Sequence, residues 1–227
     1  SGMTGSLSIV ADDGFGNTIA SATIPIVAGG GGGTWWEPLA YADLDYENDR
    51  ARINGVSYAS IAAARTAGAI AVNANGVDTV PFTPAAAYAI AGKGITSGST
   101  PAGTVCAVDD GLDGVADDEI AAIGQTLTGG SNRMTFLLRK GSATFTYNTA
   151  GAITLSAPFR AAFRIAASGA MSLNGATVTG TPNAVPVVTH FTARNRSLGD
   201  AASNATVQRV LLINQSVDET TLNGLLA

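Results

Sequence analysis

The sequence predicts an all-β protein, an antiparallel β-sandwich that contains only short helices. Glycine is frequent, at 28 of 227 residues, and this composition suits short strands and tight turns better than a helical bundle. Strand-like runs follow one another at short intervals with turn residues between them, a spacing that favours a sandwich over alternating βαβ units. The dipeptides Asn54-Gly55 and Asn174-Gly175 are typical of hairpin turns, because both residue types tolerate a positive φ.

The N-terminal residues 4–28 predict a β-hairpin of their own. Leu7 and Ile9 alternate with polar residues in its first half, and the segment 12–17 has the Asp, Gly and Asn residues of a turn. A two-stranded ribbon is not a stable domain by itself. We therefore expect this hairpin either to pack on a partner surface or to be the end of a larger domain.

A run of five glycines, Gly29–Gly33, predicts a flexible linker. We reject a phosphate-binding loop here, because no Lys-Ser or Lys-Thr pair and no helix start follow the glycines. The sequence thus predicts three regions, which are a hairpin at 1–28, a linker at 29–34 and a main domain at 35–227.

The main domain is predicted to begin with strands that meet at the Asn54-Gly55 turn, followed by a short helix at 60–66. A second helix is predicted at 218–225, with Ser216 as its N-cap and Glu219 as the capping-box partner. The later apolar runs predict strands at 70–72, 79–82, 88–95, 104–108, 133–139, 143–147, 153–155, 159–165, 170–173 and 206–213.

Composition excludes several classes of function. Only 12 residues are Lys or Arg, they are not clustered, and the net charge is −5, which argues against nucleic-acid binding. No apolar run is long enough to span a membrane. The single cysteine, Cys106, excludes an intrachain disulfide and lies in an apolar run, so we expect a buried thiol.

The low charge also predicts assembly. Charged residues make up only 13% of the chain, which suggests surface that is buried against other chains. We therefore expect a homo-oligomer, and a trimer if the protein belongs to a fibre or spike.

The sharpest local pattern is acidic, with five aspartates and a glutamate within residues 109–119. Calcium prefers several carboxylate and carbonyl oxygens that converge around a turn, and the glycines here permit such a turn. We name Asp109, Asp113, Asp117 and Glu119 as candidate Ca²⁺ ligands. A solvated acidic loop that keeps a sheet edge from pairing is the alternative.

Aromatic side chains gather near the start of the main domain. Trp35, Trp36 and Tyr58 are candidate glycan-binding residues, because flat aromatic rings stack on the apolar face of a sugar. Burial in the core or in an interface is the alternative interpretation, since aromatic residues dominate both.

The sequence predicts no catalytic residue. His190 is the only histidine and has no partner for a zinc site or a catalytic triad, so we expect a structural role. Asp43, Asp45, Glu47 and Asp78 are available as paired carboxylates for glycoside hydrolysis, but no pattern selects two of them.

The last residues, 170–227, have the order strand, Asn-Gly hairpin, strand, loop with Arg and Gly, strand and short helix. This order resembles the closing segment of the laminin-G-like, concanavalin A-like jelly roll found in phage tail-fibre, spike and virion structural proteins. The hairpin at 4–28 resembles the last two strands of a bacterial Ig-like domain. The resemblance implies a concanavalin A-like jelly roll.

It also implies a non-enzymatic virion protein of a phage or phage-like particle. Such a fibre, spike or decoration component would serve structure and adhesion, and would bind a host-surface glycan or a neighbouring subunit. The alternative is a bacterial cell-surface or secreted carbohydrate-binding module. A structural spacer without a ligand is a third possibility.

Overall fold

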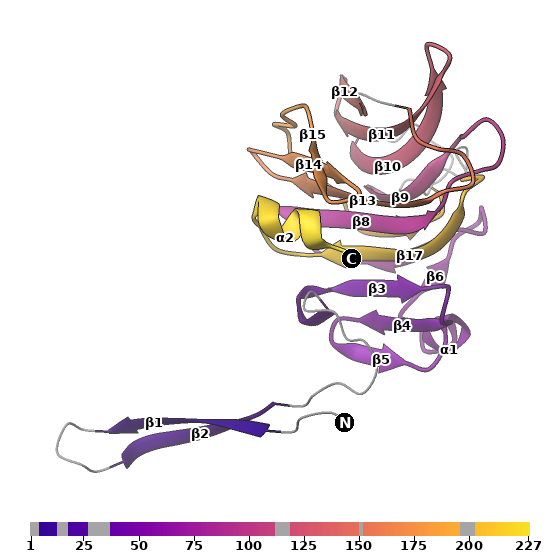
Figure 1. Cartoon of the computed structure of the whole chain (residues 1–227). Coiled ribbons are helices and arrows are strands. Elements are labelled where there is room, and N and C mark those ends of the chain that lie inside the picture. Colours follow the sequence, from indigo (N-terminus) through magenta and orange to yellow (C-terminus); the bar gives the residue numbers. More distant parts are fainter. Residues whose placement is uncertain (1–4, 13–17, 27–36, 112–118, 150–151, 196–202) are drawn as a thin grey trace. The chain divides into compact units, whose positions relative to one another are not determined.

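The structure is a computed structural model that describes residues 5–12, 18–26, 37–111, 119–149, 152–195 and 203–227. The chain divides into two compact units, residues 1–35 and residues 36–227. In the first unit, β1 (Gly5–Asp12) and β2 (Thr18–Ile26) pair as an antiparallel hairpin (Figure 1). Whether this hairpin ends an Ig-like domain stays a prediction.

The second unit is a sandwich of two antiparallel sheets, as the sequence predicts. The larger sheet has the order β15-β14-β13-β8-β17-β3-β4-β5. Its strands are β3 (Ala42–Asp45), β4 (Arg50–Ile53), β5 (Val56–Tyr58), β8 (Tyr88–Ile95), β13 (Pro158–Ile165), β14 (Ala170–Leu173), β15 (Ala176–Val178) and β17 (Thr206–Ile213). The smaller sheet has the order β12-β11-β10-β9-β16-β7-β6. Its strands are β6 (Ala71–Val72), β7 (Asp78–Pro81), β9 (Thr104–Asp109), β10 (Glu119–Thr128), β11 (Ser131–Lys140), β12 (Ala143–Asn148) and β16 (His190–Ala193).

The main core lies between the two sheets. Alternate residues of the strands point into it, as the period-two pattern requires. Phe136 of the smaller sheet and Phe163 of the larger sheet meet there edge to face, with ring centroids 5.7 Å apart and both side chains fully buried. This contact joins the two layers inside the core.

Both Asn-Gly turns form as predicted. Asn54 and Gly55 join β4 to β5, Asn174 and Gly175 join β14 to β15, and all four residues have positive φ. Because each turn has only two residues, it fixes the register of the strands on either side.

The structure contains a 3₁₀ turn, η1 (Glu37–Leu39), and two short helices, α1 (Ile61–Thr66) and α2 (Glu219–Gly224). Both helix predictions are confirmed.

The predicted capping of the second helix is wrong. Asp218 is the N-cap of α2, and its carboxylate accepts a hydrogen bond from the Thr221 N–H at 2.7 Å. Ser216 lies two residues earlier, and Val217 between them is buried in a second, smaller core under α2. Glu219 is the first residue of the helix and accepts a hydrogen bond from the Thr177 hydroxyl, so it does not complete a capping box.

One predicted strand does not form, and one observed strand was not predicted. Residues 153–155 do not form a strand; Ile153 is buried and donates its N–H to the Asn132 carbonyl, but no ladder follows. β10 was not predicted from the sequence, although it is among the longest strands of the sandwich. Its alanines and Gly124 have low β propensity, so its pairing with β9 and β11 makes it a strand.

Cys106 is fully buried, which confirms the expected structural thiol. Burial raises the pKa of this thiol far above its ordinary value, and the Sγ atom lies 3.6 Å from the Ala91 carbonyl oxygen. Within the described parts of the chain, no helix has the length and apolarity needed to cross a membrane.

Candidate functional site

The aromatic residues that the sequence singles out are only partly described by the structure. Trp35 and Trp36 lie outside the described residues. Tyr58, on β5, is partly buried and packs against the main core. It also borders a hollow of about 210 Å³, whose other walls carry charged side chains such as Arg50 and Arg52. Tyr58 therefore contributes one wall of a charged hollow, and sugar stacking on it stays a prediction.

Of the four candidate calcium ligands, Asp113 and Asp117 lie outside the described residues. Asp109 is fully buried at the end of β9 and accepts a hydrogen bond from the Gly111 N–H. Glu119 begins β10, and its two carboxylate oxygens accept hydrogen bonds from the N–H groups of residues 141 and 187. Among the residues that the structure describes, no three acidic, histidine or cysteine side chains converge as a metal site would require.

Calcium binding at residues 109–119 therefore stays a prediction. A bound ion that prefers the folded chain must raise the melting temperature by mass action. If the four ligands hold Ca²⁺, EDTA should lower the melting temperature and excess CaCl₂ should restore it. An unchanged melting temperature would leave the solvated acidic loop as the correct interpretation.

The carboxylates that glycoside hydrolysis would need are paired with arginines. Asp43 and Asp45 extend from β3 to Arg209 of β17, and Asp45 also accepts a hydrogen bond from Arg50 at 3.0 Å. Burial by itself would raise the pKa of Asp45, but hydrogen bonds from Asn48 and Arg50 and the charge of Arg209 hold it below its ordinary value.

Asp78 is likewise held by an arginine. Its carboxylate accepts two hydrogen bonds from Arg65, at 2.8 and 2.9 Å, and one from the Tyr46 hydroxyl. Arg194 stacks over the Tyr46 ring, 4.5 Å from its centroid. Glu47, the fourth candidate, accepts a hydrogen bond from a glutamine side chain of β17. These contacts give the carboxylates structural partners on the chain itself.

His190 lies at the start of β16, opposite Asp109 in the register of the smaller sheet. Its Nδ1 is 2.8 Å from the Thr189 hydroxyl. Gly111 packs so closely on the imidazole that an added Cβ would lie 2.2 Å from Nδ1. These contacts hold the ring in place and agree with the structural role that the sequence predicts.

An uncharged recess lies on the outer face of the smaller sheet, over β9 to β12. It has a volume of about 290 Å³, and we call it the threonine groove. Its polar lining consists of Thr104, Gln125, Thr126, Thr128, Thr135, Thr146 and Asn148. Its remaining lining consists of Gly103, Ala122, Gly124 and Leu137.

Strand register builds this groove. One cross-strand row runs Asn148, Thr135, Gly124 and Thr104 over four adjacent strands. Because Gly124 has no side chain, the row is open at that position, and threonines stand on both sides of it. An added Cβ at Gly124 would lie 2.9 Å from the Gly103 carbonyl oxygen, so the backbone leaves little space for a larger residue.

The groove contains threonine hydroxyls that make no hydrogen bond within the described part of the chain. The Thr126, Thr128 and Thr146 hydroxyls have no hydrogen-bond partner among the described residues. The Thr135 hydroxyl, in contrast, donates to the Asn148 side chain at 2.8 Å. These three open hydroxyls are therefore among the groups with which this recess can bind a polar ligand.

Gln125 borders the groove but faces the other way. It is opposite Met134, which belongs to the main core, and its Nε2 donates to the Asn204 side chain at 3.1 Å. The residue is only 3% exposed. We therefore do not count Gln125 among the groups that a ligand in the groove could reach.

These groove residues were not predicted from the sequence. The signal that could have found them is the alternation of threonine along QTLT, MTF and ATFT, which places hydroxyls on one face of β10, β11 and β12. The alternation becomes informative only after β10 is recognised as the strand between β9 and β11.

No protein-family model matches the chain, and no curated protein sequence matches it. Solved structures do match its fold. The IT-sialidase CBM40 of Ruminococcus gnavus, bound to α2,3-sialyllactose, is one of them. It has a TM-score of 0.51 and 12% identity, over 63% of this chain and 84% of the CBM40 chain.

Two sialidases match over part of their length. The sialidase of Trypanosoma rangeli, in complex with sialic acid, has a TM-score of 0.52 and 16% identity, over 81% of this chain and 32% of its own. The leech intramolecular trans-sialidase has a TM-score of 0.50 and 10% identity, over 66% of this chain and 27% of its own. At these identities the likeness shows the fold, a two-sheet β-sandwich, and gives the virion interpretation no support.

Proposed function

We propose that this chain is a non-enzymatic carbohydrate-binding domain, and that the threonine groove binds a neutral part of a glycan. Of the interpretations made from the sequence, we favour the module of a bacterial cell-surface or secreted protein. Its support is the sandwich fold, which also occurs in a CBM40 whose solved structure contains bound sialyllactose. Assembly into an oligomer stays a prediction of the sequence.

The observation that carries the proposal is the set of open hydroxyls in a recess without charge. Thr126, Thr128 and Thr146 can each donate and accept a hydrogen bond. A sugar ring presents hydroxyls at its rim and C–H groups on its faces. The hydroxyls suit the threonines, and the C–H groups suit the apolar surface of Leu137 and Ala122.

The same lining supports a binding role without catalysis. No ionisable side chain is among the described residues that line the threonine groove, so these residues offer no general acid, general base or charged nucleophile. The buried carboxylates Asp43, Asp45 and Asp78 belong to ion pairs elsewhere in the sandwich.

A screen of neutral oligosaccharides, followed by calorimetric titration of the strongest binder, tests this proposal. Thr126→Val and Thr146→Val remove one hydroxyl each with little change in volume. Each neutral hydrogen bond contributes about 1 kcal/mol, so each variant should weaken binding about fivefold.

Thr220→Val is the matched control, because Thr220 is exposed on α2 and does not line the groove. It should bind like the wild type. Wild-type affinity in both groove variants would overturn the assignment of the groove, and the absence of any bound oligosaccharide would overturn the function.

A further inference from the structure

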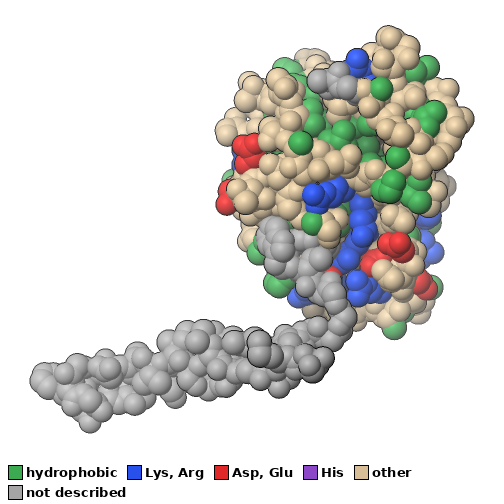
Figure 2. Space-filling view, in the orientation of Figure 1, with side chains coloured by type: hydrophobic (Ala, Val, Ile, Leu, Met, Phe, Trp, Pro, Cys, Tyr) green, Lys and Arg blue, Asp and Glu red, His purple; other side chains and the backbone are tan. Residues whose placement is uncertain are grey.

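A row of charged residues crosses the outer face of the larger sheet. In the strand register, Arg160 of β13 is opposite Lys93 of β8, and Lys93 is opposite Arg209 of β17. The row continues from Arg209 to Asp45 of β3 and then to Arg50 of β4. Figure 2 shows the Lys and Arg side chains of this face as a band that runs over β8 and β17 toward β4.

Strand alternation places these side chains on the outer face. Phe159 and Ala161 flank Arg160 in the chain, and both belong to the main core. Arg160 must therefore point the other way. In β17 a bulge between Val207 and Arg209 shifts the alternation by one residue, so that Arg209 joins the same face.

In the middle of the row, Arg209 is surrounded by carboxylates. It donates two hydrogen bonds to Asp43 and one of 3.0 Å to Glu37, and lies 3.6 Å from Asp45. Its charge is therefore already balanced by the chain itself.

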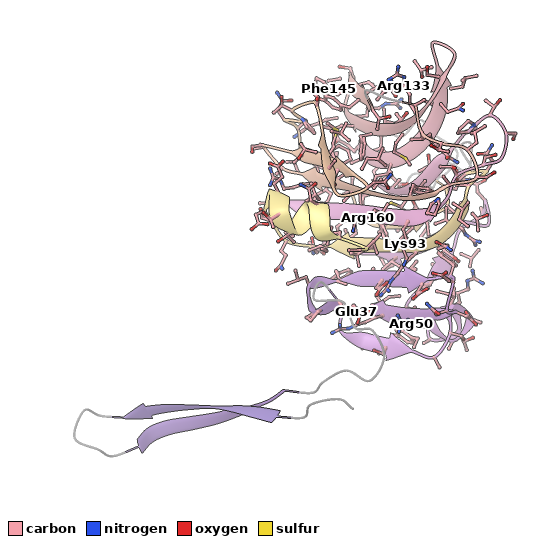
Figure 3. All side chains as sticks on the ribbon, in the orientation of Figure 1. Glu37, Arg50, Lys93, Arg133, Phe145 and Arg160 are labelled. Atoms are coloured by element: carbon pink, nitrogen blue, oxygen red, sulfur yellow. The ribbon has the colours of Figure 1, made fainter. Side chains whose placement is uncertain are left out.

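Arg160 and Lys93, which begin the row, are not balanced in this way. The side chains of Lys93 and Arg160 have no ion pair and no hydrogen bond among the described residues, and both are partly buried. The Arg160 guanidinium lies against the hairpin turn, so closely that an added Cβ at Gly175 would be 2.6 Å from one of its nitrogens. Figure 3 shows the Lys93 and Arg160 side chains near each other, apart from Glu37 and Arg50.

Two adjacent cations without a carboxylate favour the binding of an anion. Directly opposed residues of an antiparallel pair have Cβ atoms about 5 Å apart, so Lys93 and Arg160 repel each other. They also border one hollow of about 350 Å³, and the described residues that line it include no carboxylate. An anion in this hollow would be attracted by both charges.

We propose that Lys93 and Arg160 bind the anionic group of an acidic saccharide in this hollow. A planar guanidinium and an ammonium together suit one carboxylate or sulfate. The hollow has the size of a small-ligand pocket, and its other walls combine the amides of Asn174 and Gln208 with an apolar proline and leucine. This mixture suits a sugar ring, which presents hydroxyls at its rim and C–H groups on its faces.

This inference rests on the proposed function in one respect, which is that the ligand is a saccharide. It does not depend on the threonine groove, because the hollow and the groove lie on different sheets. Calorimetry with trigalacturonate and its methyl ester separates charge from ring shape. Comparing the affinity for sialyllactose with that for lactose tests a different sugar carboxylate. Comparing the affinity for galactose 6-sulfate with that for galactose tests a sulfate group. The wild type should bind at least one acidic sugar about tenfold more tightly than its neutral counterpart.

Lys93→Gln and Arg160→Gln should each remove most of this preference, and salt should weaken it. Lys140→Gln, at an exposed position of β11, removes a charge elsewhere and should keep the preference. Equal binding of every acidic sugar and its neutral counterpart would overturn the inference and leave the groove proposal intact. Binding of a poly-glutamate peptide in place of the saccharides would overturn it too.

Discussion

Replacing Arg209 by methionine is expected to lower the free energy of unfolding by about 3–5 kcal/mol, the cost of removing one partner from a buried ion pair. Asp43 and Asp45 are 6% and 1% exposed, and the variant leaves the first without its arginine and the second with Arg50 alone. Denaturant titration at neutral pH measures the change. Lys140→Met is the control, because it removes an exposed charge and should change stability by less than about 0.5 kcal/mol.

The loss of stability at acid pH tests the same group of residues, which is Arg209 with Asp43 and Asp45. The pKa of Asp45 is held below its ordinary value of 3.8, so the folded state prefers the ionised carboxylate. That preference stabilises the protein fully above the ordinary value and is lost as the pH falls through the lowered pKa. Hydrogen bonds from Asn48 and Arg50 contribute more to this lowering than the charge of Arg209 does, so Arg209→Met should reduce the loss of stability below about pH 4 only in part. A variant as stable as the wild type at pH 7 would show that the cluster contributes no net stability.

Turn chemistry made much of the fold predictable. Asn54-Gly55 and Asn174-Gly175 fix two hairpins through local backbone preference, and apolar runs such as 206–213 mark buried strands. β10 was not predicted because alanine and glycine have little strand preference. It becomes a strand by pairing with its two neighbours, β9 and β11. Local sequence cannot report a preference that only tertiary pairing creates.

The candidate sites were less predictable than the fold, because strand register assembles them. Lys93, Arg160 and Arg209 are far apart in sequence and become neighbours only when β13, β8 and β17 pair. The patterns that stand out in the sequence are clusters along the chain, such as the tryptophan pair 35–36 and the acidic segment 109–119. Proximity in sequence and proximity on a sheet face are different properties in a sandwich.

Gly94 lies opposite the bulge that turns Arg209 outward. Its partner in the register is Val207, and an added Cβ would lie 2.2 Å from the Thr206 carbonyl oxygen. Backbone atoms cannot move away as a flexible side chain would. Gly94→Ala should therefore lower the free energy of unfolding by about 3 kcal/mol, the upper part of the usual range for overpacking. Gly98→Ala is the control, because its Cβ would meet only a serine hydroxyl, at 3.1 Å.

A double-mutant cycle decides whether the loss of unfolding free energy in Gly94→Ala includes the loss of the ion pairs of Arg209. If the bulge positions Arg209, then Gly94→Ala already weakens the contacts of Arg209 with Asp43, and adding Arg209→Met should cost less than it does in the wild type. Coupled residues typically deviate from additivity by about 0.5–3 kcal/mol. Additive losses of unfolding free energy would mean that Gly94 only accommodates the close approach of two strands, and that the orientation of Arg209 does not depend on it.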